Sequence, residues 1–237
     1  TATAAPNDWA ELGTSSEALG YLGQRDMLTR FFSRKATYAS DRGKRKEWNI
    51  KPWAEDGPFW HGLASWGRTA RMPPAHGFDD ARFILPSLNV NHIKVDARQS
   101  TPGMLFDMPA VGWKEEQEAI RRTITERCEQ AAQSVHDNGA TSMVWCNRND
   151  EGDLLARLLP DAVQVAGRHS DEQKEEAAKW FVKGADEERV LISKSSIFGF
   201  GLNFQHCQHM TYFPNWSYEQ YYQASRRLWR FGQTQPV

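Results

Sequence analysis

The stretch S-M-V-W-C-N-R-N-D-E-G-D-L-L, residues 142–155, decides how the second half of the chain folds. Residues 142–146 form a short, largely apolar run, which is typical of a strand buried on both faces. The polar step N-R-N-D follows, and Asp150 opens a segment whose leucines recur at helical spacing, at 154, 155, 158 and 159. The stretch therefore predicts a strand, a short loop and a helix in that order.

The same alternation continues on both sides of this stretch. Residues 115–138 predict one long helix, ended by Asn138-Gly139, with an apolar stripe formed by Ile120, Ile124, Cys128, Ala131 and Val135. Apolar runs predict strands at 162–165, 190–193 and 210–213, and Ser170 with Gln173 forms a capping box for a helix through residue 183. Alternation at this spacing predicts an α/β fold, a parallel sheet with helices on both faces. Ligand-binding groups then belong in loops at the carboxyl ends of the strands.

The last predicted helix carries an unusual polar face. Its start has the spacing of a capping box and a hydrophobic staple, formed by Ser217 with Gln220 and by Trp216 with Tyr221. Gln223, Arg227 and Arg230 follow at intervals of four and three residues, so they share one face. Guanidinium groups bind phosphate oxygens bidentately, so this face predicts a phosphate clamp. The alternative is a solvated basic helix end, which the helix dipole favours.

Three motifs make the chain resemble the C-terminal portion of a superfamily 2 helicase or translocase. Q-A-S-R-R-L-W-R-F-G-Q, residues 223–233, resembles motif VI in its Swi/Snf-like form, and G-F-G-L-N-F, residues 199–204, resembles motif V. The opening T-A-T-A-A-P-N, residues 1–7, resembles motif III, with Ala4 where proline is usual. The resemblance points to a phage-type, Swi/Snf-like DNA helicase, and it implies that the sheet is RecA-like.

The resemblance also implies roles for individual residues. Arg230 is the expected arginine finger, Arg227 a second phosphate ligand, and the groups expected near ATP are Gln223, Asn203 and Gly201. Contacts to the nucleic-acid backbone are expected from Asn147, Arg148, Lys194, Ser195 and Gly199. Thr1 and Thr3 are expected to couple the two lobes. Phe198 stands where remodellers usually have the first glycine of a pair, which is a departure from the family pattern.

The implied cofactors are ATP and Mg²⁺, and the implied partners are DNA and a first RecA-like lobe. The sequence contains no G-x-x-x-x-G-K-[ST] loop for the phosphates, and Asp171-Glu172 is interpreted as capping charge. The magnesium ligands are therefore expected in the missing lobe, and the chain alone is expected not to hydrolyse ATP. The alternative function is a non-catalytic nucleic-acid-binding module that retains the helicase fold.

Three segments are expected along the chain: residues 1–14 as the end of the first lobe, 15–85 as a helical protrusion and linker, and 86–237 as the second lobe. The protrusion is expected to hold helices at 16–22, 26–32 and 59–71, and residues 88–95 are expected to form a strand. The charged run 41–47 predicts either a solvated loop or a contact with nucleic acid.

Composition sets the remaining expectations. The net charge is −1, so any basic surface must be local, and the three cysteines include no C-x-x-C pair, which favours a reducing cytosol over disulfides. No signal peptide or membrane-spanning run is recognised, so the expected location is the cytoplasm of a bacterium or a phage-infected host cell. A metal site at His206, Cys207 and His209 is not expected, because no second ligand pair accompanies them. The start without methionine suggests a fragment or a processed product.

Overall fold

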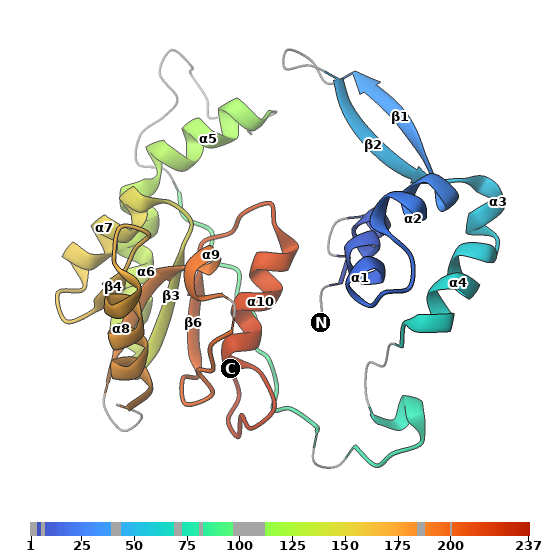
Figure 1. Ribbon diagram of the computed structural model, residues 1–237. Helices are drawn as coiled ribbons and strands as arrows, with labels where there is room; N and C mark the ends of the chain where they lie inside the picture. The colour runs from blue at the N-terminus through green and yellow to red at the C-terminus, as the bar shows by residue number, and fades with distance from the viewer. Residues whose placement is uncertain are drawn as a thin grey trace. The chain divides into compact units, whose positions relative to one another are not determined.

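The computed structural model describes residues 4–5, 8–38, 44–68, 73–80, 83–96, 112–183, 188–199 and 201–237. The chain divides into two compact units, Thr1–Phe83 and Ile84–Val237 (Figure 1). No helix in the described ranges is long and apolar enough to cross a membrane. The division into three segments stays a prediction.

The second unit is built on a four-stranded sheet with the order β4-β5-β3-β6, in which every neighbouring pair is parallel. Its strands are β3 (Ser142–Cys146), β4 (Val163–Val165), β5 (Val190–Lys194) and β6 (His209–Tyr212). Its helices are α5 (Trp113–Arg122), α6 (Ile124–Asn138), α7 (Asn149–Leu158), α8 (Asp171–Lys183), α9 (Ser195–Phe198) and α10 (Tyr218–Leu228). This arrangement confirms the predicted α/β fold.

Helices cover both faces of this sheet. Side chains alternate along β3, so Met143 and Trp145 join one core with residues of α8 and α10. Val144 and Cys146 point to the opposite core, which residues of α6 and α7 complete. Figure 1 shows α10 beside β6 and α8 beside β4. Burial on both faces explains why β3 reads as a continuous apolar run.

Several local predictions in this unit were wrong. The helix from residue 115 breaks at Thr123, whose hydroxyl donates to the Ala119 carbonyl at 2.8 Å and whose backbone leaves the helical region. Ser217 does cap α10 by accepting from the Gln220 N–H, but the return bond is absent because the Ser217 N–H donates to Asn215 Oδ1 at 2.9 Å. Residues 88–95 form no strand; nearby, Asn89 N–H donates to the Val237 carbonyl.

The staple expected at the start of α10 also fails. The Trp216 side chain is 78% exposed, and its indole N–H donates to the Glu116 carboxylate at 3.1 Å. Tyr221 instead packs edge-on against Tyr212, with the ring centroids 5.3 Å apart.

The first unit packs short helices against a hairpin. Its helices are α1 (Leu12–Ala18), α2 (Gln24–Phe31), α3 (Pro52–Glu55) and α4 (Pro58–Trp66), with 3-10 turns η1 (Trp9–Glu11) and η2 (Pro73–His76). The antiparallel hairpin consists of β1 (Phe32–Tyr38) and β2 (Lys44–Ile50). Phe31, Phe32 and Phe59 are all buried in the core of this unit.

Several predictions for this unit need correction. The hairpin was missed, and residues 44–47 of the charged run lie in β2, whereas 41–43 lie outside the described residues. Ser16 does not cap a helix but lies inside α1, where its hydroxyl donates to the Leu22 carbonyl at 2.9 Å. The helix expected at 59–71 begins at Pro58 and ends at Trp66, with Gly67 in extended conformation after it.

Candidate functional site

Arg227 occupies the last turn of α10 and is held by the loop that precedes β6. Its Nη1 donates to the Leu202 carbonyl, its Nη2 to Gln223 Oε1, and its Nε to the Gln223 carbonyl, each at 3.0 Å. The Arg227 carbonyl in turn accepts from the Phe204 N–H at 2.8 Å. These bonds fix the guanidinium against residues 202–204, so the predicted pair Gln223 and Arg227 does act as a unit.

Arg230 reaches the same loop, although not by the predicted route. The helix ends at Leu228, so the position of Arg230 is set by the turn that follows the helix and not by helical spacing from Arg227. Its Nη1 donates to Asn203 Oδ1. Its Nε is buried and has no hydrogen-bond partner among the described residues. The structure therefore brings Asn203, Arg227 and Arg230 together from segments about two dozen residues apart.

Two positive charges lie close together at this point. Burial lowers the pKa of Arg227, and the neighbouring charge of Arg230 lowers it further. Within the described part of the chain, neither guanidinium forms an ion pair with a carboxylate. A half-buried charge without a counterion is less favourable than a solvated one, so this cluster is suited to an anion such as a phosphate.

Glycines shape the loop that meets the arginines. Gly201 has φ of +79°, a left-handed conformation that favours glycine. A Cβ at Gly199 would collide with the Ser195 carbonyl, which accepts from the Gly199 N–H at 2.8 Å. Both positions thus require glycine for the backbone path from α9 to Asn203.

A second polar group lies at the carboxyl edge of the sheet. Gln220 Oε1 accepts from Ser195 Oγ at 3.1 Å and from Asn215 Nδ2 at 2.8 Å. Asn215 Nδ2 also approaches Asn147 Oδ1, at 3.4 Å. The loops after β3, β5 and β6 are thereby joined, and the expected residues Asn147 and Ser195 fall in one group.

The two basic residues at this edge, Arg148 and Lys194, differ in whether they form an ion pair. Arg148 is paired with Asp150, Nη2 to Oδ2 at 2.8 Å, and this hydrogen-bonded guanidinium lowers the pKa of the Asp150 carboxyl. Lys194 is half-buried at the end of β5 and forms no ion pair within the described ranges. Lys194 is therefore the better placed of the two for a phosphate.

A buried carboxylate anchors the loop after β3. Glu151 is 1% exposed, and its Oε2 accepts from the Asn147 and Arg148 N–H groups at 2.9 Å each. Its Oε1 accepts from Arg127 Nη1 at 2.7 Å, and the Arg127 guanidinium lies 5.2 Å from the Phe213 ring centroid. Sequence reasoning missed this network because an acid in the first turn of a helix also suits the dipole. The Asn215 link was missed too; its position two residues before an N-cap serine is a signal for an Asx turn.

The predicted site residues thus form two groups rather than one. Gln220 and Arg227 are seven residues apart on α10, which corresponds to about 10 Å along the helix axis. The arginine cluster is therefore separated along α10 from the polar group at Gln220, and it contacts residues 202–203 of the loop that connects β5 and α9 to β6. Thr1 and Thr3 lie outside the described residues.

The histidines and cysteines near β6 have structural surroundings. Cys207 is fully buried, and its Sγ lies 3.3 Å from the carbonyl oxygens of both Thr141 and His209. Burial lowers the pKa of His206, which packs 5.0 Å from the Phe181 ring centroid. Among the described residues, no group of three or more His, Cys, Asp or Glu side chains could hold a metal ion.

Comparison with known proteins addresses the second unit. Residues 123–232 match the family model described as helicase conserved C-terminal domain, so this part of the chain has the RecA-like fold of a helicase C-terminal lobe. The matched region is thus similar to part of a helicase or translocase. Comparison with curated proteins gives no match.

Among solved structures, 38 chains match. One is the C-terminal part of the Fun30 ATPase domain, with 17% sequence identity, a TM-score of 0.42, and coverage of 50% of this chain and 40% of that chain. The chain thus spans less than half of that structure's length.

Proposed function

We propose that this chain is the C-terminal portion of an ATP-dependent DNA helicase or translocase of the Swi/Snf-like, phage type. In this proposal, residues 86–237 are the second RecA-like lobe, and Arg227 and Arg230 face a nucleotide held by a first lobe. The observation that carries the proposal is the junction of Asn203, Arg227 and Arg230, where two close guanidiniums form no ion pair within the described residues.

The chemistry of phosphoryl transfer suits such a pair. Catalysis consists mainly of positioning and of stabilising the charge that develops on the transferred phosphoryl group, and Mg²⁺ bridges and neutralises its oxygens when bound. Arg230, whose Nε has no partner among the residues that the structure describes, is the proposed finger, and Arg227, held by Gln223, is the second phosphate ligand. The sequence lacks a phosphate-cradling loop, so the magnesium ligands and that loop belong to the first lobe, and this chain alone is proposed to be inactive.

The carboxyl edge is the proposed path of the nucleic acid. An amide, a hydroxyl and an ammonium group, from Asn147, Ser195 and Lys194, lie at the ends of β3 and β5, and the Gly199 backbone follows. Such groups recognise phosphate and sugar and carry no base specificity. The proposed binding is therefore independent of sequence and weakens as salt concentration rises. Thr1 and Thr3 are proposed to couple the two lobes.

The test is a pair of substitutions in the full-length protein that contains this chain. Arg230→Ala is expected to reduce DNA-stimulated ATP hydrolysis about a thousandfold, because an arginine finger contributes on that scale, while DNA binding is retained. The matched control is Arg226→Ala on the same helix, because the Arg226 guanidinium stacks on Trp229 at 4.4 Å from its ring centroid instead of facing Asn203. Equal losses in the two variants would remove Arg230 from its role. DNA binding without any ATP hydrolysis in the unsubstituted protein would favour a non-catalytic binding module.

A further inference from the structure

The first unit contains a pocket that neither the arginine cluster nor the carboxyl edge uses. It has a volume of about 490 Å³ and lies between α1, α2 and α4. This volume is within the range of small-molecule sites, roughly 300 to 1,000 Å³. Its size alone says nothing about a ligand, so its walls and charges decide the argument.

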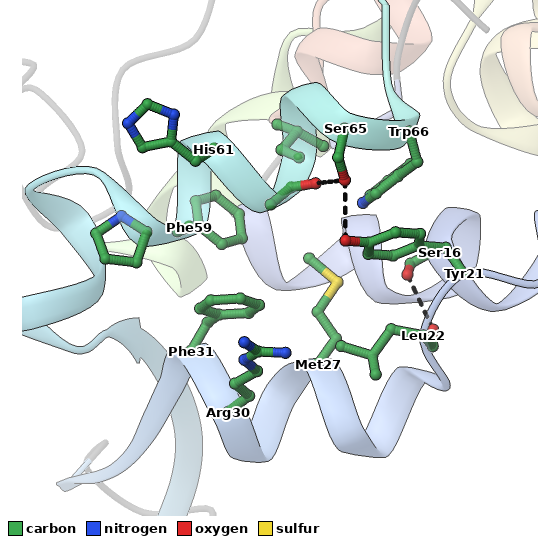
Figure 2. A pocket seen from close by; sticks show the side chains of 13 residues that line it. Ser16, Tyr21, Leu22, Met27, Arg30, Phe31, Phe59, His61, Ser65 and Trp66 are labelled. Atoms are coloured by element: carbon green, nitrogen blue, oxygen red, sulfur yellow. Dashed lines mark hydrogen bonds between the residues drawn. The ribbon is translucent and has the colours of Figure 1, made fainter.

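Aromatic rings form much of the wall. Figure 2 shows Phe31 and Phe59 near one end and Tyr21 and Trp66 near the other. The Tyr21 and Trp66 rings are 5.9 Å apart with an interplanar angle of 34°, and the Tyr21 hydroxyl lies 2.9 Å from Ser65 Oγ. Tyr21 is nonetheless 52% exposed, so about half of its surface is left uncovered by protein. Flat faces held in this way suit a planar ring.

The charges of the pocket favour an anion at its Phe31 end. Arg30 is exposed on α2, and its guanidinium lies 5.2 Å from the Phe31 ring centroid. It forms no ion pair within the described ranges, and none of the residues that line the pocket is Asp or Glu. A cationic ligand would therefore meet repulsion without compensation, whereas a phosphate would find a permanently charged partner.

We propose that this pocket receives one unstacked base of single-stranded DNA, stacked on Tyr21 and Trp66, with the adjacent phosphate bound by Arg30. A base joined to a phosphate is the ligand that combines a planar ring with a nearby negative charge, and aromatic side chains with Arg are the usual means of binding it. The inference rests on the proposed function for the choice of DNA as the ligand. It adds a second contact point on the protrusion, separate from the strand-end loops.

The test uses this chain and a fluorescent single-stranded oligonucleotide, with binding measured by anisotropy as a function of salt. Tyr21→Ala is expected to weaken binding about tenfold without changing the salt slope, because stacking carries no charge. Arg30→Gln is expected to make the log–log salt slope shallower by about 0.7, the value for one phosphate on a single strand. The matched controls are Arg25→Gln, exposed on the same helix outside the pocket, and Trp9→Ala, a half-exposed aromatic that does not line it.

A second measurement reports the position of the base directly. An oligonucleotide that contains 5-iodouracil should cross-link to Tyr21 or Trp66, and peptide mass spectrometry locates the link. Unchanged affinity and unchanged salt slope in both pocket variants, with cross-links at other residues, would overturn the proposed base pocket. If Lys194→Gln nevertheless weakened binding of the oligonucleotide, the proposed function would still stand. Failure of the unsubstituted chain to bind the oligonucleotide would contradict the pocket and the proposed DNA path together, but not the arginine role, which ATP hydrolysis tests.

Discussion

The buried carboxylate of Glu151 gives the most quantitative expectation. In Glu151→Gln, one of the two oxygens becomes an NH₂ group, and both original oxygens face donors: Arg127 Nη1 on one side and the Asn147 and Arg148 N–H groups on the other. Whichever way the new amide turns, a donor meets a donor, and Arg127 loses its counterion. The substitution is nearly isosteric, so cavity effects do not obscure the electrostatic loss.

The size of the loss follows from the burial of the pair. Breaking a buried ion pair by removing one partner costs about 3–5 kcal/mol. The Arg127 side chain is 20% exposed, so water compensates it in part, and we expect a decrease of about 2–4 kcal/mol in the free energy of unfolding. Arg127→Met should cost at least as much, about 3–5 kcal/mol, because Glu151 Oε1 loses its donor and the buried carboxylate keeps only the two backbone N–H groups at Oε2.

Urea unfolding followed by near-ultraviolet circular dichroism measures this difference, with an unchanged m-value as the check that the unfolded state is the same. The control is Asp153→Asn on the same helix, which breaks the solvent-exposed pair with Arg168, whose side chains are 57% and 44% exposed for Arg168 and Asp153. Exposed pairs contribute about 0–1 kcal/mol, so the control should change little. A Glu151→Gln loss no larger than that of the control would refute the anchoring role.

Three further outcomes are expected. Pyrophosphate should raise the melting temperature of the chain, by the equivalent of about 2.7 kcal/mol at a hundred times its Kd, and Arg230→Gln should abolish the effect if the arginine cluster binds the anion. Burial lowers the pKa of His206, so as the pH falls the unfolded chain takes up the proton before the folded chain does. The contribution of the neutral imidazole to stability is therefore complete above the ordinary pKa of about 6.5 and is lost as the pH falls below that value. His206→Asn should flatten this pH dependence of the free energy of unfolding, which urea titration measures. Burial raises the pKa of the Cys128, Cys146 and Cys207 thiols to about 12. Iodoacetamide should therefore leave the folded chain unlabelled at pH about 8 and modify all three thiols in urea. Labelling of the folded chain would contradict the burial of these cysteines.

The parts of the fold that could be predicted are those in which local sequence and burial agree. Residues 142–146 were predicted as a strand to the residue, because a strand covered on both faces forms a nearly continuous apolar run, here Met143 to Cys146 after Ser142. The Ser170 and Gln173 capping box also forms with both of its bonds, at 3.3 and 2.9 Å. The hairpin of β1 and β2 could not be read in this way, since its strands are rich in Lys and Arg and are anchored by Phe32 in a core that only the folded unit creates.

The candidate site shows the same limit at a finer scale. Helical spacing correctly paired Gln223 with Arg227, because four residues on one helix have a fixed geometry. It could not show that the helix ends before Arg230, nor that Asn203 meets Arg230 across 27 residues, since tertiary contacts decide both. The break at Thr123 was hidden for a related reason: apolar spacing continues across it from Ile120 to Ile124, although of α5 and α6 only α6 contributes buried residues to the core.

One helix connects the two polar groups of the second unit. Gln220, Gln223 and Arg227 follow at intervals of three and four residues, so they lie along one stripe of α10. Gln220 is bonded to the loops at the carboxyl edge, and Gln223 with Arg227 is bonded to the loop before β6. In the proposed function, a displacement of the strand-end loops by DNA would therefore move Arg227 as part of a rigid body. Coupling between the two sites then needs no chain of side-chain rearrangements, because an α-helix transmits a shift at its first turn to its last.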